Sequence, residues 1–261
     1  MSEEFAQEMA ELAGEVPFPH VLNWVELLRT AHVPGEEVLA SLIEARPSAA
    51  SYAVRLVKAW RRHAAEMPGA GVALGLEAAA RVHLAESAAR PSIVVSGPTS
   101  DAVPVRLTVS AVTEIVRAAR ESLLVVSFAV YGIDEIAREL AAAAKRGVRV
   151  DLVMESGIEE GGTLRGTTGA TAFRLLRGKA TFWGWPPARR PAGASLHAKL
   201  LAADNKIALL GSANLTRRAM LTNIEIGVIL RDPGAVTQIV SHFRTLMRPG
   251  SGPLEPVTVN H

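Results

Sequence analysis

The stretch Ser195 to Asn214, SLHAKLLAADNKIALLGSAN, constrains the fold of this chain more than any other. Polar and apolar residues alternate at its start, so an extended strand would place Ser195, His197 and Lys199 on one face. The triplet Asp-Asn-Lys from Asp204 predicts a tight turn, because Asp and Asn side chains hydrogen-bond to the backbone of such turns. An apolar run then returns as a partner strand. The stretch therefore predicts a β-hairpin that carries a histidine and a lysine on the same face.

Polar residues follow the second strand of this hairpin. The tetrapeptide Gly-Ser-Ala-Asn closes it, and exposed backbone N–H groups there, with the Ser212 hydroxyl and the Asn214 amide, would suit an oxyanion or a phosphate. Further on, Asn223, Glu225 and Gly227 share one face of another predicted strand. The sequence thus predicts a polar site built from one hairpin and the strand after it.

The rest of the chain divides at Pro91. Apolar spacing before it predicts four helices, near 18–30, 34–46, 48–67 and 72–89, packed as a small N-terminal helical domain over 1–90. After Pro91, strands and helices alternate, which predicts an α/β fold with a sheet flanked by helices over 91–248. We expect residues 249–261 to form a C-terminal tail.

Composition limits the compartment and the partners. Cysteine is absent, which excludes disulfides and thiolate metal sites and fits a reducing compartment. The acidic N-terminus lacks the features of a signal peptide, and no apolar run reaches membrane-spanning length. We therefore expect a soluble, cytoplasmic protein that does not bind membranes.

Charge is distributed unevenly along the chain. Residues 1–90 carry 12 acidic and 8 basic side chains, whereas residues 91–261 carry 14 acidic and 20 basic ones. No carboxylate lies between Glu160 and Asp204, a span with seven basic residues and several aromatics. Such a span could follow a phosphate backbone while its aromatic rings stack on bases. The substrate-binding residues predicted on this ground are Arg177, Lys179, Trp183, Trp185, Arg189 and Arg190. The alternative is that the aromatics belong to the core and the arginines are merely solvated.

The hairpin positions together resemble the HKD motif of the phospholipase D superfamily. That motif reads His-x-Lys, four residues, Asp, six residues and Gly-Ser-x-Asn, and the chain matches it at every position. The resemblance covers about residues 91–248 and implies a mixed sheet flanked by helices. It also implies a catalytic set of His197, Lys199, Asp204, Ser212, Asn214 and Glu225.

The resemblance assigns a role to each of these residues. It implies that His197 attacks phosphorus to form a phosphohistidine, while Lys199, Asn214 and Ser212 donate to the non-bridging oxygens. Glu225 would accept a hydrogen bond from the other ring nitrogen of His197. Asp204 follows the strand, which suggests a structural or electrostatic role. This chemistry requires no metal and no cofactor, and the segment has too few carboxylates for a magnesium cluster.

A second histidine is needed as the acid for the leaving oxygen, yet the chain has only one His-x-Lys. Members of the superfamily with a single motif form a two-fold dimer, so the resemblance implies a homodimer with one shared active site.

The helical region, the WGWP segment and the basic loop before the motif also resemble the phospholipase-D-like components of DISARM anti-phage systems. This resemblance implies other DISARM proteins as partners and nucleic acid, chiefly DNA, as the substrate of a nuclease. Two alternatives remain open at this point. One is a phospholipase or phosphatidyl transferase, and the other is a non-catalytic DNA-binding subunit.

Overall fold

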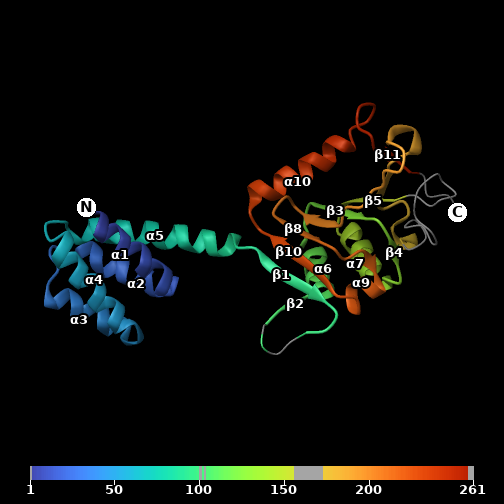
Figure 1. Cartoon of the computed structure of the whole chain (residues 1–261). Coiled ribbons are helices and arrows are strands. Elements are labelled where there is room, and N and C mark those ends of the chain that lie inside the picture. Colours follow the sequence, from blue (N-terminus) through green and yellow to red (C-terminus); the bar gives the residue numbers. More distant parts are fainter. Residues whose placement is uncertain (1, 100–101, 103, 156–172, 258–261) are drawn as a thin grey trace. The chain divides into compact units, whose positions relative to one another are not determined.

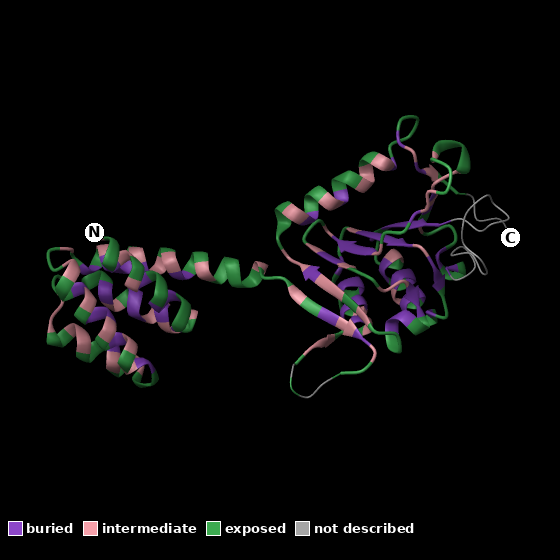
Figure 2. Cartoon of the chain, in the orientation of Figure 1, coloured by how far each residue is buried: buried purple, intermediate pink, exposed green. Residues whose placement is uncertain are grey.

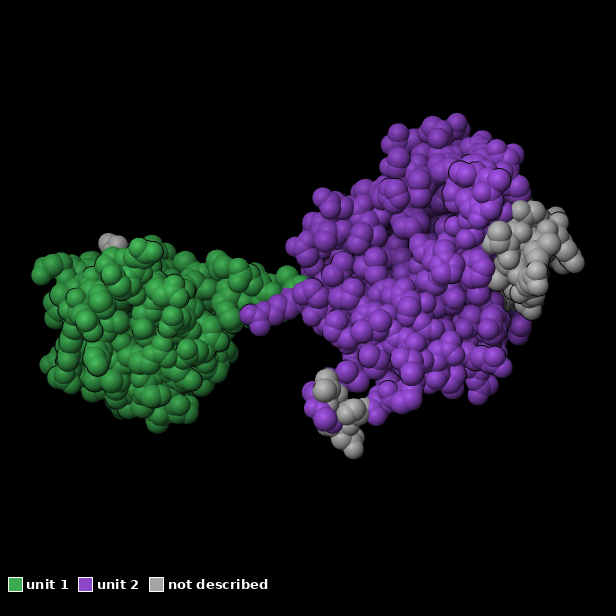
Figure 3. All heavy atoms as spheres, viewed as in Figure 1, with its two compact units in different colours: residues 1–89 green, residues 90–261 purple. Residues whose placement is uncertain are grey.

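The computed structural model describes residues 2–99, 102, 104–155 and 173–257. The chain forms two compact units, residues 1–89 and residues 90–261 (Figure 3). In the part of the chain that the structure describes, no helix is both long and apolar enough to cross a membrane.

The first unit is helical. Its elements are α1 (Glu3–Glu15), α2 (Phe18–Thr30), α3 (Glu36–Ala45), the 3₁₀ turn η1 (Pro47–Ala49), α4 (Ala50–His63) and α5 (Gly69–Ala89). The prediction of four helices missed α1, although Phe5, Met9 and Leu12 recur at helical spacing and are buried. Ser2 caps this helix by accepting a hydrogen bond from the Phe5 amide at 3.3 Å.

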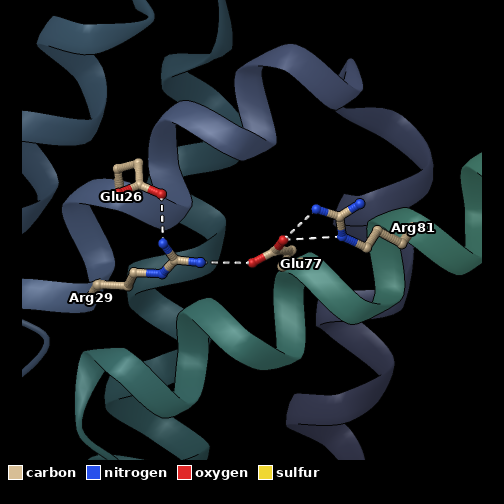
Figure 4. A network of polar contacts seen from close by, with 4 residues as sticks. All are labelled: Glu26, Arg29, Glu77 and Arg81. Atoms are coloured by element: carbon tan, nitrogen blue, oxygen red, sulfur yellow. Dashed lines mark hydrogen bonds and ion pairs between the residues drawn. The ribbon is translucent and has the colours of Figure 1, made fainter.

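The core of this unit contains two fully buried tryptophans whose polar atoms are paired. The Trp24 indole N–H donates to the Leu42 carbonyl at 3.1 Å, and that of Trp60 to the Met67 carbonyl at 2.9 Å. On the surface, an ion-pair network of Glu26, Arg29, Glu77 and Arg81 joins α2 to α5 (Figure 4).

The second unit is built on a nine-stranded mixed sheet of order β11-β6-β5-β3-β7-β8-β10-β1-β2 (Figure 1). Strands β3, β5 and β6 are mutually parallel, and β7 is antiparallel to β3. The strands are β1 (Ser92–Ser96), β2 (Arg106–Leu107), β3 (Ser122–Ser127), β5 (Arg149–Met154), β6 (Thr181–Gly184), β7 (Leu200–Ala203), β8 (Ile207–Gly211), β10 (Glu225–Leu230) and β11 (Glu255–Pro256). A mixed sheet flanked by helices and preceded by helices confirms the predicted fold class.

Helices cover both faces of this sheet, and alternate strand residues supply two cores (Figure 2). Leu123 and Val125 of β3 belong to the core beneath α6 (Thr108–Ala118) and α7 (Asp134–Lys145). Leu124 and Val126 point the other way and pack with α10 (Pro233–Leu246). The remaining described elements are small: η3 (Arg174–Leu176), η4 (Pro187–Arg189), α9 (Arg217–Leu221), and the two-stranded pair of β4 (Val130–Tyr131) with β9 (Leu215–Thr216).

The expected C-terminal tail is partly built into the fold. Leu254 is buried, and β11 pairs antiparallel with β6 through Glu255 and Gly184. The predicted tail from residue 249 therefore contains a short strand, which the sequence did not indicate because two residues leave too short a pattern.

Strand register decides which residues meet. The start of β7 lies beside the end of β3, since Leu200 is opposite Val126. The end of β8 lies beside the start of β10, since Gly211 is opposite Gly227. The His-x-Lys segment, the Gly-Ser-Ala-Asn loop and Glu225 therefore gather at the carboxyl ends of β3 and β5, which we call the His197 end of the sheet.

Candidate active site

The predicted hairpin is present as β7 and β8. Asp204 and Asn205 both adopt left-handed backbone conformations, with φ of 54° and 53°, in the three-residue loop between the paired residues Ala203 and Ile207. The ladder starts at Leu200, so the preceding five residues lie outside the strand that the alternation predicted. Leu196 is nevertheless buried, His197 exposed and Lys199 half-buried, which turns the two polar side chains away from the core.

His197 and Lys199 contact each other. The Lys199 ammonium lies 3.0 Å from Nδ1 of His197 and donates to the His197 carbonyl at 2.7 Å. Phe128 packs against both, with its ring centroid 5.2 Å from that of the imidazole and 5.8 Å from the Lys199 nitrogen. Sequence reasoning did not include Phe128, although its place directly after the buried strand β3 is a signal that could have marked it.

The environment of Lys199 acts on its charge in two directions. Partial burial lowers its pKa below the ordinary lysine value, and the negative charge of Glu225 opposes that effect without cancelling it. Lys199 therefore loses its proton more readily than a solvated lysine.

Glu225 and Ser212 form one hydrogen-bonded unit. The Ser212 hydroxyl donates to Oε2 of Glu225, and the Ile226 amide donates to the Ser212 oxygen at 3.2 Å. Asn223 donates to Oε1 of Glu225 at 3.2 Å. In the described residues no hydrogen bond joins Glu225 to His197, so the expected His–Glu pair is not formed in this single chain.

Two glycines allow this close packing of β8 and β10. A Cβ at Gly211 would lie 2.9 Å from the Ile226 carbonyl oxygen, and one at Gly227 would lie 2.8 Å from the Leu210 carbonyl oxygen. A side chain at either position would push the two strands apart.

Asn214 is positioned by the end of β3. Its Oδ1 accepts from the Ala129 amide at 3.4 Å, which leaves the side-chain NH₂ group to donate elsewhere. The buried Ser127 hydroxyl fixes the same junction, because it donates to the Ala129 carbonyl at 2.8 Å and accepts from the Leu215 amide at 3.1 Å.

Asp204 lies at the other end of the hairpin and does not contact His197. Its carboxylate accepts three backbone hydrogen bonds, from Arg120 at 2.9 Å, Glu121 at 2.8 Å and Ser122 at 2.9 Å. Burial works against ionisation of this carboxyl, but the three amides outweigh it and hold the pKa of Asp204 below its usual value. Asp204 therefore secures the start of β3, which supports the structural role that its place after the strand suggested, and its membership of the catalytic set stays a prediction.

The two arginines of the loop before the motif are paired within the protein. Arg190 forms an ion pair with Glu155 at 2.8 Å, and the two side chains are 6% and 1% exposed. The second oxygen of Glu155 accepts from the Leu196 amide at 2.7 Å, one residue before His197. Arg189 donates to the Gly252 carbonyl at 2.7 Å and pairs with Glu255 at 2.8 Å. Both arginines thus position chain segments. Arg190 is closed to a phosphate, whereas the side chain of Arg189 is 40% exposed.

The tryptophans are also committed internally. Trp183 donates its indole N–H to Asp151 at 3.0 Å, and Trp185 donates to the Arg189 carbonyl at 3.0 Å, while both rings pack on the core beneath α10. Arg177 and Lys179 are exposed but precede β6, so they lie at the end of the sheet opposite His197. The indole N–H groups of both tryptophans are thus engaged within the protein, and substrate binding by these four residues stays a prediction.

The carboxylates and histidines of the described residues do not form a metal-binding cluster. Across residues 2–99, 104–155 and 173–257, no three His, Asp or Glu side chains are grouped so that they could hold a metal ion.

Comparison with known proteins places this geometry in a family. Residues 112–247 match the family model described as "Cardiolipin synthase, PLD-like domain". The DISARM protein DrmC of Bacillus paralicheniformis is 28% identical over 141 residues, which cover 52% of this chain and 55% of that protein. The chain thus spans about half the length of this curated relative.

Solved structures were compared as well. NucT from Helicobacter pylori aligns with a TM-score of 0.47 and 18% identity, covering 59% of this chain and 93% of its own. Nuc from Salmonella typhimurium, a phospholipase D family member, aligns with a TM-score of 0.42 and 23% identity over the same shares. The family model covers more than half of the 261 residues. The chain therefore belongs to the PLD-like domain family, as its HKD positions predicted.

Proposed function

We propose that this protein is a metal-independent nuclease that cleaves phosphodiester bonds, chiefly of DNA, through a phosphohistidine on His197. One observation carries the proposal. His197 and Lys199 are in contact at the end of the sheet where Ser212, Asn214 and Glu225 also lie, and His197 is exposed to a substrate. Family membership supports the phosphodiesterase chemistry, whereas the substrate and the mechanism are our proposal.

The reaction proceeds in two displacements. Nε2 of His197 attacks phosphorus, the P–N bond forms, and the bond to the leaving oxygen breaks as that oxygen takes a proton from an acid. Water then attacks the phosphohistidine and gives a proton back to the group that served as the acid, while the P–N bond breaks and the imidazole is regenerated. Asn214 and Lys199 donate to the non-bridging oxygens, whose charge changes along the path.

Lys199 must change partners during this cycle. When its ammonium donates to Nδ1 of His197, the neutral ring carries its proton on Nε2 and cannot attack with that atom. Transfer of the ammonium to a phosphate oxygen frees Nδ1 to take the proton. The nucleophile is then formed only when a phosphate is bound.

The acid is supplied by a second copy of the chain. The chain has one His-x-Lys. An apolar patch on β1 and around the start of β10 is formed by Ile93, Ile224 and Ile226, which are 51%, 87% and 62% exposed. A patch of this kind fits a two-fold contact that buries it and brings two His197 side chains into one site. In that dimer, Glu225 would accept a hydrogen bond from the imidazole of the second copy.

A role in anti-phage defence beside other DISARM proteins is supported by the similarity to DrmC. The description of the matching family model names a cardiolipin synthase, which keeps phosphatidyl transfer as the second candidate.

To test the proposal, the full chain is incubated in chelator with labelled DNA, with labelled RNA, or with vesicles of phosphatidylcholine and phosphatidylglycerol. We expect cleavage of DNA by the wild-type protein and none by His197→Ala. Turnover of lipid alone would replace the proposal with phosphatidyl transfer. Binding of DNA without cleavage, by a protein shown to be dimeric, would replace it with a non-catalytic DNA-binding role.

A further inference from the structure

A second basic feature lies away from His197, in an open groove of about 610 Å³ between α10 and the strands β5 and β6. Three arginines line it, Arg149 from β5 and Arg244 and Arg248 from α10 and the residues after it. Hydroxyls of α10 and the half-buried Trp183 complete the lining. None of the three arginines belongs to the basic span that precedes the motif.

Negative charge is scarce in this groove. Asp151 is the one carboxylate of the described lining, and both of its oxygens are used, by Trp183 at 3.0 Å and by Arg149 at 3.4 Å. In the described residues neither Arg244 nor Arg248 is paired with a carboxylate. Arg244 and Arg248 thus present to the groove guanidinium groups that no described carboxylate pairs, whereas Arg149 is paired with Asp151.

The charged form of Arg244 is disfavoured in this groove. Partial burial lowers its pKa, the nearby charge of Arg149 lowers it further, and Asp151 offsets only part of this effect. An anion in the groove would relieve this repulsion. A phosphate is well suited, because the planar guanidinium fork matches two phosphate oxygens.

The position of the groove restricts the class of ligand that could bind it. Arg149 and Asp151 lie at the start of β5, whereas His197 lies beyond the opposite ends of these strands. At about 3.3 Å per strand residue, the two places are roughly 15–20 Å apart. A phospholipid headgroup cannot fill both, but a DNA strand can, because it carries one phosphate for about every 3.4 Å of helix axis.

We propose that Arg149, Arg244 and Arg248 form a phosphate-binding groove that holds the backbone of a nucleic acid several nucleotides from the phosphodiester under attack. The inference rests on the proposed nuclease function for its substrate class. It assigns affinity for long substrates to the groove and bond cleavage to the His197 end.

Binding is measured with the full-length His197→Ala protein in chelator, which leaves the probe uncut, and a fluorescein-labelled 20-base-pair DNA duplex. Arg244→Gln with Arg248→Gln is compared with a control pair, Arg62→Gln with Arg138→Gln. The control removes the same charge from exposed positions outside the groove. We expect the groove pair to weaken binding about ten-fold and to reduce the salt slope by about two, since each lost phosphate contact removes roughly 0.9. The control pair should bind as its parent does.

Equal binding by the groove pair and its parent would overturn the inference. So would groove-dependent binding of vesicles of phosphatidylcholine with phosphatidylglycerol but not of the duplex. Because Arg244 is half-buried, Arg248→Gln alone serves as the variant that keeps the fold, and it should reduce the slope by about one.

The same groove substitutions in protein with an intact His197 separate this inference from the proposed function. We expect an unchanged rate on bis(4-nitrophenyl) phosphate, which is too small to reach the groove, and a raised KM on long DNA. Failure of all cleavage, with groove-dependent DNA binding intact, would refute the nuclease and leave the groove. Normal cleavage with an unchanged KM on long DNA would refute the groove and leave the nuclease.

Discussion

The two ends of the central hairpin carry residues of one motif but do different work. At one end, His197 is exposed beside Lys199 and Phe128, and its ring atoms are available to a ligand. At the other end, the Asp204 carboxylate accepts hydrogen bonds from three backbone amides at the start of β3. The contrast teaches that fixed spacing in a motif can reflect chemistry at one position and strand placement at another.

The largest effect is expected at the chemical end. His197→Ala should reduce DNA cleavage by at least about 10³-fold, because it removes the proposed nucleophile and, in a dimer, also the acid. Its melting temperature should match that of the wild type, since the side chain is exposed. Cleavage assays with thermal melts on one preparation check both. Wild-type cleavage by His197→Ala would erase the difference between the two ends.

The loop before the motif sharpens the comparison with a buried pair. Arg190→Gln removes the positive charge that pairs with the buried Glu155 carboxylate and should lower the free energy of unfolding by about 3–5 kcal/mol. Arg189→Gln is the matched control, because its pair with Glu255 is roughly half exposed and should cost at most about 1 kcal/mol. Urea unfolding of both variants measures this. Equal losses would mean that burial does not distinguish the two pairs.

The structural end makes a prediction about pH. The pKa of Asp204 is lowered in the folded chain, so its stabilising effect is present above the unfolded pKa and is lost as pH falls through the folded one. Asp204→Asn should lower the free energy of unfolding by about 1–3 kcal/mol at pH 7 and flatten its acid dependence below roughly pH 4. Turnover per folded molecule should stay within a few-fold of wild type. A loss of turnover as deep as that of His197→Ala would place Asp204 in the catalytic set.

Lys199 gives the smallest expected effect, a shift in a pH profile. The pKa of Lys199 is lowered in the folded chain, so the ammonium that donates to a phosphate oxygen in the proposed reaction loses its proton at a lower pH than a solvated lysine does. Solvated lysines lose their proton near pH 10, and we expect kcat/KM to fall at a lower pH than that on the alkaline side of the profile. Lys199→Arg should retain some activity and move this limb upward, because arginine stays protonated. An identical alkaline limb in both proteins would assign it to another group.

Local features of this fold could be predicted from the sequence. The hairpin, its turn at Asp204 and the contact of His197 with Lys199 depend on residues that are close along the chain. Membership in the PLD-like family followed from the same spacing. These features needed no knowledge of how distant segments pack.

Pairings between distant segments could not be predicted. Arg190 reaches Glu155 across 35 positions, and Arg244 comes close to Arg149 only because α10 lies on β5 and β6. A basic residue in sequence therefore does not reveal whether its charge is already balanced. For this reason two of the arginines predicted to bind substrate, Arg189 and Arg190, are paired, whereas Arg244 and Arg248 of the groove were not recognised.

The central claim is that chemistry belongs to the His197 end alone. It is tested most directly by trapping the intermediate: substrate is mixed with excess enzyme, the reaction is quenched in base, and peptides are analysed by mass spectrometry. The account predicts a phosphorylated adduct on His197 in wild-type protein and in Asp204→Asn, and none in His197→Ala. An adduct on another residue, or cleavage of DNA with no adduct at any quench time, would contradict it.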